Sequence, residues 1–269
     1  MPSLTRRAVT ALAALFAAGA IAQPLGEEVP FIVSPDNVTL EMLRMADVKA
    51  GDHVIDLGSG DGRIVILAAR RFGATGLGVE IDPELVRKSI ASARDAGVGE
   101  RVTFRVEDLF TTDLSRATVI TMYLLPEFNL RLRPSLLALK PGTRIVSHDW
   151  DMGDWPPDRT TQVDVPQKQV GRDKFSRVHL WVVPARVEGV WCGSGAMQGA
   201  TLRVSQRYQR FEATLVRPAG PSAFSGRIEG ETLRPEAGAS PLALRARGDQ
   251  LDVLAPGSGG FSRAASGSC

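Results

Sequence analysis

The chain has 269 residues, of which 43% are hydrophobic and 23% charged, and its formal net charge is +2. This length and composition predict a globular protein of one large domain or two small ones. The near balance of charge gives no case for strong binding to nucleic acid or to an anionic membrane, so we expect no nucleic-acid partner. The two cysteines lack the spacing of metal ligands, so we expect no zinc or other metal site.

Residues 1–22 have the composition of a secretory signal peptide. Arg6 and Arg7 form a basic start, residues 8–22 are apolar without a charge, and Ala20-Ile21-Ala22 has the small-x-small pattern of a cleavage site. The apolar run is short for a membrane span, and an uncleaved N-terminal anchor is the alternative. The segment therefore predicts an exported, periplasmic or envelope-tethered protein and is left out of the fold prediction.

After a linker, residues 36–46 carry apolar side chains at helical spacing. They predict an amphipathic helix with Ser34 or Asp36 near its cap.

A short buried strand, Val54-Ile55-Asp56-Leu57, then runs into the turn Gly58-Ser59-Gly60-Asp61-Gly62, and residues 63–71 predict a second helix. Glycines allow the backbone to take positive φ and to come close to a ligand. Strand, glycine turn and helix are typical of the opening of a nucleotide-binding βαβ unit. The pattern D-x-G-x-G-x-G differs from the dinucleotide form, and no Walker lysine follows it, which argues against a phosphate-binding P-loop.

The next two predicted strands each end near an acidic residue. Residues 76–80 end in Glu80, where such folds place a carboxylate that accepts both ribose hydroxyls. A helix is predicted from Asp82-Pro83, and a third strand, residues 101–106, is followed by Asp108.

In this order and spacing, these signals resemble the class I, seven-strand S-adenosylmethionine (SAM) methyltransferases. The resemblance implies an α/β fold, a doubly wound Rossmann-like seven-strand sheet, with SAM as cofactor. It implies that the glycine turn approaches the methionine part of SAM, that Glu80 binds the ribose and that Asp108 lies by the adenine. The implied cofactor-binding residues are Asp56, Gly58, Ser59, Gly60, Asp61, Glu80 and Asp108.

The core Asp56-Leu57-Gly58-Ser59-Gly60-Asp61-Gly62-Arg63 and the segment Pro30-Phe31-Ile32-Val33-Ser34-Pro35 resemble one subgroup of that class. Its members are small bacterial, archaeal and mitochondrial enzymes related to protein-lysine methyltransferases. The resemblance implies that the segment before the first helix folds over the cofactor and shapes the acceptor channel. Phe31 is the candidate substrate residue here, and simple packing of its ring is the alternative.

Residues 118–127 predict the fourth strand and its exit, and residues 143–150 predict the fifth. The ends of both strands are expected at the crevice where open α/β sheets bind ligands. The fourth strand lacks the Asn/Asp-Pro-Pro-aromatic tetrad of many amino-methylating relatives, which argues against adenine or glutamine N-methylation, and it offers Tyr123 instead. At the end of the fifth strand, His148 is a candidate to take a proton from the acceptor, and Asp149 to orient it or attract a cationic lysine. Structural roles for these three residues are the alternative.

Residues 177–184 alternate in polarity and predict the last strand of the sheet, while the stretch 154–173 supplies either the sixth strand or a loop. From Arg186 the pattern changes to short alternating runs broken by Gly, Pro and Ser, which predicts a small antiparallel β meander or barrel. We therefore divide the chain into a methyltransferase domain, residues 29–185, and a β-rich module, residues 186–269. Cys192 and Cys269 form a disulfide if the chain is exported, and stay free thiols otherwise.

The function predicted is SAM-dependent transfer of a methyl group to a nitrogen, such as a protein lysine, or to an oxygen acceptor. The methyl acceptor is a protein or a small molecule, and a membrane tether through the N-terminus is a further partner. One alternative is a non-catalytic envelope protein with a retained nucleotide-like pocket and a ligand-binding β module. Because SAM is made in the cytosol, a cytoplasmic location is the alternative to export.

Overall fold

The computed structural model describes residues 32–168, 171–238, 242–255 and 258–269. The predicted signal segment, residues 1–22, and the predicted substrate residue Phe31 lie outside the described residues. The remainder is made of a sheet domain followed by a β-barrel.

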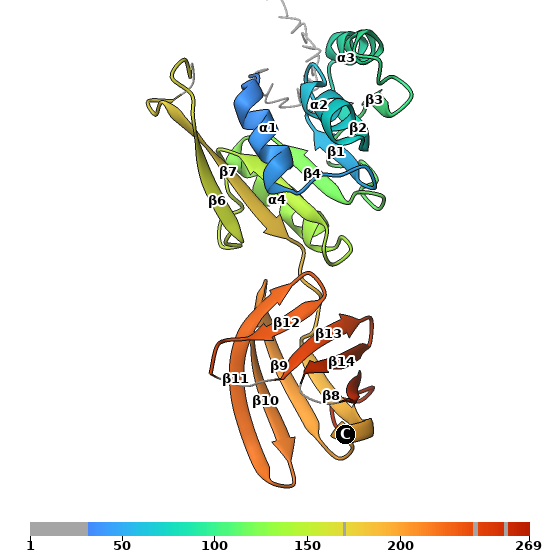
Figure 1. Ribbon diagram of the computed structural model, residues 1–269, viewed down its shortest axis with the longest axis vertical. Helices are drawn as coiled ribbons and strands as arrows, with labels where there is room; N and C mark the ends of the chain where they lie inside the picture. The colour runs from blue at the N-terminus through green and yellow to red at the C-terminus, as the bar shows by residue number, and fades with distance from the viewer. Residues whose placement is uncertain (1–31, 169–170, 239–241, 256–257) are drawn as a thin grey trace, which may run out of the picture. The chain divides into compact units, whose positions relative to one another are not determined.

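The sheet domain contains a seven-stranded mixed sheet in the order β3-β2-β1-β4-β5-β7-β6. The first five of its strands in the chain pair in parallel, and β7 runs antiparallel to both β5 and β6. Figure 1 shows β6 and β7 as a long hairpin at the end of the sheet. The elements are α1 Asp36–Met45, β1 His53–Leu57, α2 Arg63–Phe72, β2 Thr75–Glu80, α3 Pro83–Asp95, β3 Val102–Val106, β4 Val119–Met122, α4 Pro126–Leu137, β5 Arg144–His148, β6 Arg159–Asp164 and β7 Phe175–Val182.

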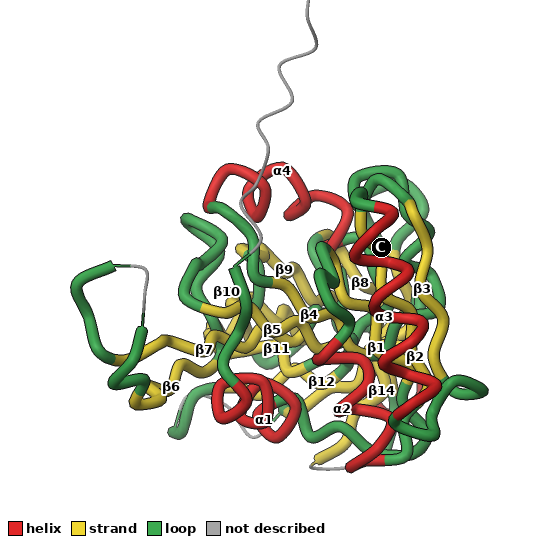
Figure 2. The backbone as a smooth tube through the Cα atoms, turned by 90° about the horizontal axis from the view of Figure 1, so that it is seen from above, coloured by secondary structure: helices red, strands yellow, loops and turns green. Residues whose placement is uncertain are grey.

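Helices cover both faces of this sheet, as Figure 2 shows, with α4 on one side of β1, β4 and β5 and α1 and α2 on the other. Successive side chains of a strand point to opposite faces, so each central strand must be apolar on both. Val54, Val119 and Val146 accordingly pack into the core with α1 and α2. Ile120 and Ile145, which point to the opposite face of their strands, pack into the core under α4.

The same alternation aims three polar side chains at the face that α1 covers. Asp56, Thr121 and His148 lie two residues after the valines of that face, at the C-terminal ends of β1, β4 and β5. A row of polar groups therefore caps the apolar core at the edge of the sheet where the parallel strands end.

The helix starts add detail to the sequence expectations. The residue before α1 is Pro35, so Ser34 and Asp36 both lie next to the cap as predicted, although no side-chain cap hydrogen bond is made there. Instead, the Ser34 hydroxyl bonds to His148. Helix α4 begins at Pro126, within the stretch predicted as the exit of the fourth strand, because proline suits a first helical turn. The segment left open by the sequence contains a strand, β6.

The chain after the sheet domain forms a closed antiparallel barrel of eight strands, in the order β10-β11-β12-β13-β14-β15-β8-β9. Apolar side chains fill its interior, with Trp191, Phe211 and Phe261 among the most buried. The alternating pattern predicted this antiparallel β module. Its elements are β8 Gly189–Ser194, the short 3-10 helix η1 Gly195–Met197, β9 Thr201–Arg207, β10 Arg210–Arg217, β11 Gly220–Glu229, β12 Thr232–Pro235, β13 Ala243–Arg247, β14 Gln250–Ala255 and β15 Gly260–Arg263.

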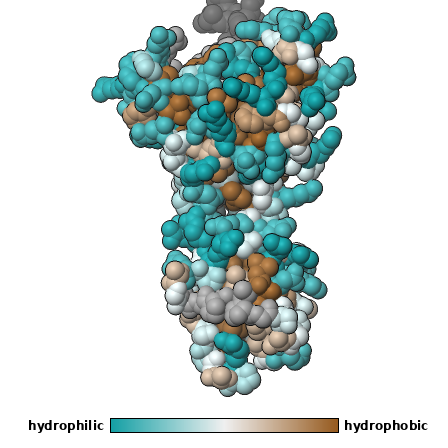
Figure 3. Space-filling model, in the orientation of Figure 1, coloured by the Kyte–Doolittle hydropathy of each residue, from teal (hydrophilic) through white to brown (hydrophobic). Residues whose placement is uncertain are grey.

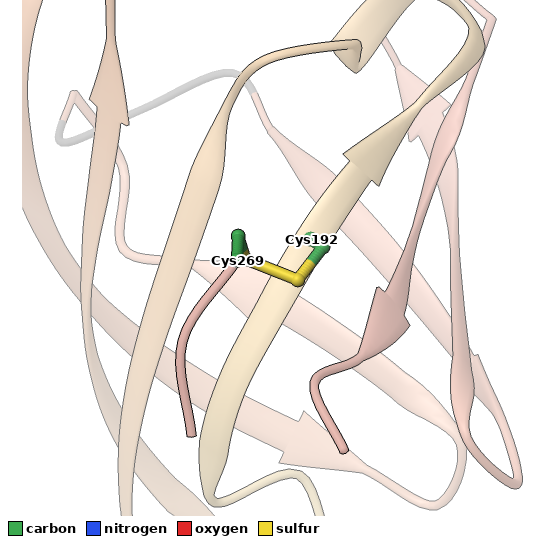
Figure 4. Close-up of a disulfide and its surroundings, with 2 residues drawn as sticks. All are labelled: Cys192 and Cys269. Carbon is green, nitrogen blue, oxygen red and sulfur yellow. A yellow bond between two sulfur atoms is a disulfide. The ribbon is translucent and has the colours of Figure 1, made fainter. Parts of the chain in front are cut away.

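A disulfide joins Cys192 on β8 to Cys269, as Figure 4 shows. Their Cα atoms are 5.5 Å apart, and 77 positions separate them in the sequence. Closing a loop of this length removes conformational entropy from the unfolded chain that corresponds to about 4 kcal/mol. The disulfide therefore ties the end of the chain to the barrel and stabilises it.

On the face drawn in Figure 3, hydrophilic side chains surround smaller apolar patches. Two exposed apolar side chains in the sheet domain adjoin predicted site residues: Ile81 is 73% exposed and Trp150 is 41% exposed. None of the helices in the described residues has the length and apolar character needed to cross a membrane.

Candidate active site

The glycine turn after β1 is held tightly against the end of β2. Gly58, Gly60 and Gly62 all have positive φ, at 73°, 53° and 77°. The backbone N–H groups of Gly58 and Ser59 donate to the carbonyl of Val79 at 3.0 and 2.8 Å. A Cβ added at Gly62 would come within 2.7 Å of the Phe104 ring. Only glycine at this position satisfies both the left-handed backbone and the packing, so the turn is a rigid edge for a ligand.

Glu80 connects β2 to this turn. Its carboxylate accepts hydrogen bonds from the N–H groups of Gly60 at 2.9 Å, Ile81 at 2.8 Å and Asp82 at 3.2 Å. Three backbone donors fix the carboxylate beside the turn, and its remaining lone pairs are suited to accept from a diol. The exposed side chain of Ile81 lies next to it in the chain and offers an apolar surface.

Asp108 follows the neighbouring strand. Residue Val106 of β3 pairs with Glu80 of β2, so Asp108 lies two residues beyond that pair at the same end of the sheet. Its Oδ1 accepts a hydrogen bond from the Phe110 N–H at 2.8 Å, which fixes the loop that follows. The side chain is exposed, in keeping with a place at the rim of the site.

Asp56 lies underneath the turn. It is 2% exposed and accepts a hydrogen bond at 2.7 Å from the hydroxyl of Thr121 on β4. Burial, with smaller contributions from the charges of Glu80 and Asp61, raises the pKa of Asp56 to about 7, although the Thr121 hydrogen bond opposes the shift. Near neutral pH this carboxyl is therefore partly protonated, and it ties β1 to β4 below the site.

Asp61 and Arg63 link the turn to the segment before α1. Two hydrogen bonds join the Arg63 guanidinium to the Asp61 carboxylate, at 2.9 and 2.8 Å. Burial acts to raise the pKa of Asp61, but the hydrogen bonds and charge of Arg63 outweigh it and hold that pKa below its ordinary value. Nη1 of Arg63 also donates to the carbonyl of Ser34 at 3.1 Å, which fixes the start of the described chain against the turn.

The imidazole of His148 is buried between two serines. It is 1% exposed, and its Nδ1 and Nε2 lie 2.8 Å from the hydroxyls of Ser34 and Ser176. Burial, together with the charge of Lys168, lowers the pKa of His148 to about 4, although Asp149 acts in the opposite direction. The ring is therefore neutral at pH 7 with both nitrogens engaged, which fits an orienting role and not direct contact with a substrate.

Tyr123 lies flat on this histidine, with ring centroids 3.8 Å apart and planes inclined by 26°. Its hydroxyl is hydrogen-bonded to Asp149, and burial, followed by the charge of that carboxylate, raises the pKa of Tyr123 to about 12. The phenol is therefore a neutral donor to Asp149 throughout the physiological range. Its oxygen keeps lone pairs that are free to accept a hydrogen bond from a ligand.

Asp149 holds several elements together directly after β5. Its φ of +63° is rarely adopted by a residue other than glycine. The carboxylate accepts from the Arg177 N–H at 2.9 Å and pairs with the Lys168 ammonium at 2.7 Å. Lys168, in the connection between β6 and β7, has no sequence signal that marks it, because its partner is distant in the chain.

The predicted residues thus form two groups. Around the glycine turn lie Asp56, Gly58, Ser59, Gly60, Asp61 and Glu80, with Asp108 at the end of the next strand; at the ends of β4 and β5 lie Tyr123, His148 and Asp149. Ser34 connects them, because its carbonyl binds Arg63 and its hydroxyl binds His148. A cavity of about 390 Å³ lies elsewhere, between the loop after β3 and α4, and none of the predicted site residues lines it.

These features fit an adenosyl ligand. The turn presents backbone, Glu80 presents a fixed carboxylate, and Ile81 presents an exposed apolar side chain beside it. The Ser59 hydroxyl is buried without a hydrogen-bond partner, so the turn keeps an unused polar group. Within the described residues, no cluster of His, Cys, Asp or Glu is suited to hold a metal ion.

The chain is similar to known proteins. Residues 56–159 match the model of the ANTKMT methyltransferase domain. A protein-lysine N-methyltransferase of Saccharolobus islandicus is 42% identical over 138 residues, which cover 51% of this chain and 86% of that protein. The adenine nucleotide translocase lysine N-methyltransferase of Mus musculus is 30% identical over 135 residues, which cover 50% of this chain and 58% of that protein.

A solved structure is also similar. It is an RNA methyltransferase from Salinibacter ruber in complex with S-adenosyl-L-homocysteine, 50% identical, with a TM-score of 0.53. The match covers 58% of this chain and 96% of that one. S-adenosyl-L-homocysteine is what remains of SAM after methyl transfer.

The fold and the site, together with these relatives, define a class I SAM-dependent methyltransferase, with SAM as its cofactor. Its Rossmann-like sheet carries the glycine turn and acidic strand ends predicted from the sequence. Within that class, the chain belongs to the protein-lysine N-methyltransferase-like family.

Proposed function

We propose that this enzyme transfers the methyl group of SAM to the side-chain amine of a lysine in a protein. The observation that carries the proposal is the arrangement after β4 and β5, where the Tyr123 ring stacks on His148 and the neighbouring Asp149 carboxylate binds an alkylammonium, that of Lys168, at 2.7 Å. The two relatives described above, both named as lysine N-methyltransferases, support the same acceptor. The match covers only 58% of the mouse protein, so its support is limited to that part.

The cofactor residues supply binding and orientation. We assign the ribose hydroxyls to Glu80, the adenine to the surface beside Ile81 and Asp108, and the methionine part to the glycine turn. SAM brings both the reactive methyl carbon and its leaving group, so the enzyme needs no nucleophile of its own. Holding acceptor and methyl in line is worth about 7–11 kcal/mol of the barrier.

The acceptor side is suited to a cationic amine. The Asp149 carboxylate already holds one alkylammonium, that of Lys168, at 2.7 Å. Because the Tyr123 hydroxyl donates a hydrogen bond to Asp149 and stays neutral, its oxygen is available to accept a hydrogen bond from an N–H group of the incoming lysine. A lysine attacks only as the neutral amine, so its ammonium gives one proton to solvent before the methyl group is transferred. His148 is not assigned that proton, since both its ring nitrogens are hydrogen-bonded to serines.

Apolar side chains border this side of the site and suit contact with a protein. Trp150, which follows Asp149, is 41% exposed, and Leu130 of α4 is 43% exposed. Asn129 donates to the carbonyl of Trp150 at 3.2 Å, which places the two exposed side chains on adjoining segments. We assign them to residues that flank the acceptor lysine.

The compartment proposed is outside the cytosol. The signal-like residues 1–22 and the disulfide between Cys192 and Cys269 support it, because disulfides persist in oxidising compartments. To test this, the chain is recovered from separate cell fractions and its mass is compared with the mass expected after cleavage at Ala22. Recovery of the whole chain in the cytosol with free thiols would overturn it.

The experiment for the reaction uses SAM with a labelled methyl group and a whole-cell extract. We expect label in protein that resists nuclease treatment, and none with Glu80→Ala. Label that nuclease releases would assign the enzyme to RNA, the acceptor in the name of the Salinibacter ruber relative. Label in the small-molecule fraction would equally overturn the proposal.

A further inference from the structure

Residues 149–158, which we call the acceptor loop, connect β5 to β6 and begin with Asp149. Helix α4 holds the first half of this loop. Asn129 donates to the carbonyls of Trp150 and Asp151, both at 3.2 Å, and Arg133 donates to the carbonyl of Met152 at 2.8 Å. The position of Asp149, and through it the Tyr123 hydroxyl, therefore depends on how this loop is anchored.

The barrel holds the second half. Gln209, in the turn between β9 and β10, donates to the carbonyl of Pro156 at 2.6 Å and accepts from the indole N–H of Trp155 at 3.1 Å. Its neighbour Tyr208 donates its hydroxyl to Asp154 at 2.9 Å and stacks on the Trp155 ring with 6.0 Å between ring centroids. Two consecutive residues of the barrel thus bind three consecutive residues of the acceptor loop.

The contact between Gln209 and Trp155 is buried, whereas the Tyr208–Asp154 hydrogen bond is exposed. Trp155 is fully buried and Gln209 is 1% exposed. The Trp155 carbonyl accepts in turn from the indole N–H of Trp181 on β7, at 2.9 Å. Tyr208 has a φ of +54°, a strained value for a tyrosine. Such a conformation persists where surrounding contacts determine it, which is the case at this turn.

A second barrel contact lies at the end of the loop. Arg227 of β11 pairs with Oδ1 of Asp158 at 2.8 Å, while Oδ2 of Asp158 accepts from the Val182 N–H at 2.8 Å. Tyr208, Gln209 and Arg227 also bind the sheet domain through their side chains. Among the described residues, the partners of these hydrogen bonds belong to the acceptor loop. None of these bonds reaches the glycine turn or Glu80.

We infer that the turn between β9 and β10, through Tyr208 and Gln209, is a positioning element for the acceptor side of the methyltransferase site. The barrel completes the enzyme by fixing the loop that carries Asp149. This inference rests on the proposed function of Asp149 and Tyr123 and extends it to residues more than about 50 positions away in the chain. Misplacing a reacting group by about 1 Å costs up to about 100-fold in rate, so the anchoring of this loop matters for turnover.

The test compares Gln209→Ala and Tyr208→Phe with the wild-type full chain in the presence of SAM and an extract protein that the wild type methylates. Gln209→Ala leaves the Trp155 N–H and the Pro156 carbonyl without their partner. We expect it to lower kcat/KM for the acceptor about 10-fold and to leave the Kd for SAM within twofold. Tyr208→Phe, which keeps the ring and loses one hydrogen bond, should lower kcat/KM for the acceptor about threefold.

The control is Arg247→Ala, which removes an exposed pair with Asp252 at another place on the barrel and should change neither quantity. Coupling separates positioning from general stability. In a Tyr123→Phe background, Gln209→Ala should lower kcat/KM for the acceptor less than threefold, since the Tyr123 hydroxyl that Gln209 helps to position is already absent. Should Gln209→Ala not fold, the comparison is made with Tyr208→Phe alone.

Two results would overturn the inference: folded variants with wild-type kcat/KM, or a loss that is fully additive with Tyr123→Phe. A wild-type chain that labels no protein would instead contradict the proposed function. The two failures are thus told apart by the wild-type reaction itself.

Discussion

Removing the Glu80 carboxylate should weaken SAM binding by about 3 kcal/mol, which is about 100-fold in Kd. The carboxylate is held beside the glycine turn by the N–H groups of Gly60, Ile81 and Asp82. In the proposed complex it accepts hydrogen bonds from both ribose hydroxyls. A hydrogen bond to a charged group contributes about 1.5–3 kcal/mol, so the loss of two is worth at least the figure given.

Calorimetric titration with SAM measures this directly. Glu80→Gln keeps the shape of the side chain and one acceptor oxygen but loses the charge, and it should raise the Kd for SAM about 10-fold. The matched control is Glu84→Ala, because this carboxylate lies in the first turn of α3 and its side chain is 76% exposed. Thermal unfolding of each variant confirms that it is folded at the temperature of titration. A Glu80→Ala chain whose Kd stays within threefold of wild type would refute the placement of the ribose.

Three further predictions rest on particular contacts. Tyr123→Phe should lower kcat about 10-fold or more with a Kd for SAM within twofold of wild type, measured by labelled-methyl transfer and calorimetry; equal kcat values would remove the hydroxyl from the site. Burial raises the folded-state pKa of Asp56 from its ordinary value of 3.8 to about 7. Between these two pH values the native chain therefore binds more protons than the unfolded chain. Its free energy of unfolding accordingly falls as pH rises from about 4 to about 7. Asp56→Asn should remove this loss, about 1.4 kcal/mol for each pH unit in that window, in urea unfolding at a series of pH values, and parallel curves for the two chains would contradict it. Cys192→Ser should lower the free energy of unfolding of the barrel by about 4 kcal/mol, with unchanged SAM affinity; an unchanged urea midpoint would show that the disulfide does not stabilise the native barrel.

The part of the site that is local in sequence could be predicted from it. The strand, the turn and Glu80 all lie within residues 54–80, and their apolar runs, glycines and terminal acid each have a direct structural meaning. The Asp61–Arg63 pair is equally local and could have been found, since the two residues are two positions apart. Alternating runs after Arg186 were enough to predict an antiparallel module, but they did not decide between an open meander and the closed eight-stranded barrel that the structure has.

Contacts between distant segments could not be predicted. Ser34 and His148 are 114 positions apart, so no pattern in one stretch shows that the first binds the second. The sequence placed Ser34 near a helix cap and left His148 open between a proton acceptor and a structural residue, whereas in the fold the two side chains are hydrogen-bonded to each other. Lys168 and Gln209 were missed for the same reason, because their partners Asp149 and Trp155 become neighbours only when the chain folds.

The most direct test of the central claim is the identity of the atom that receives the methyl group. Wild-type chain is incubated with extract and SAM carrying an isotopically labelled methyl group, and the products are digested enzymatically to amino acids and nucleosides. We predict that mass spectrometry finds the label in Nε-methyllysine, and that Glu80→Ala abolishes it. Label in a methylated nucleoside, in a small molecule or in another amino acid would contradict the account.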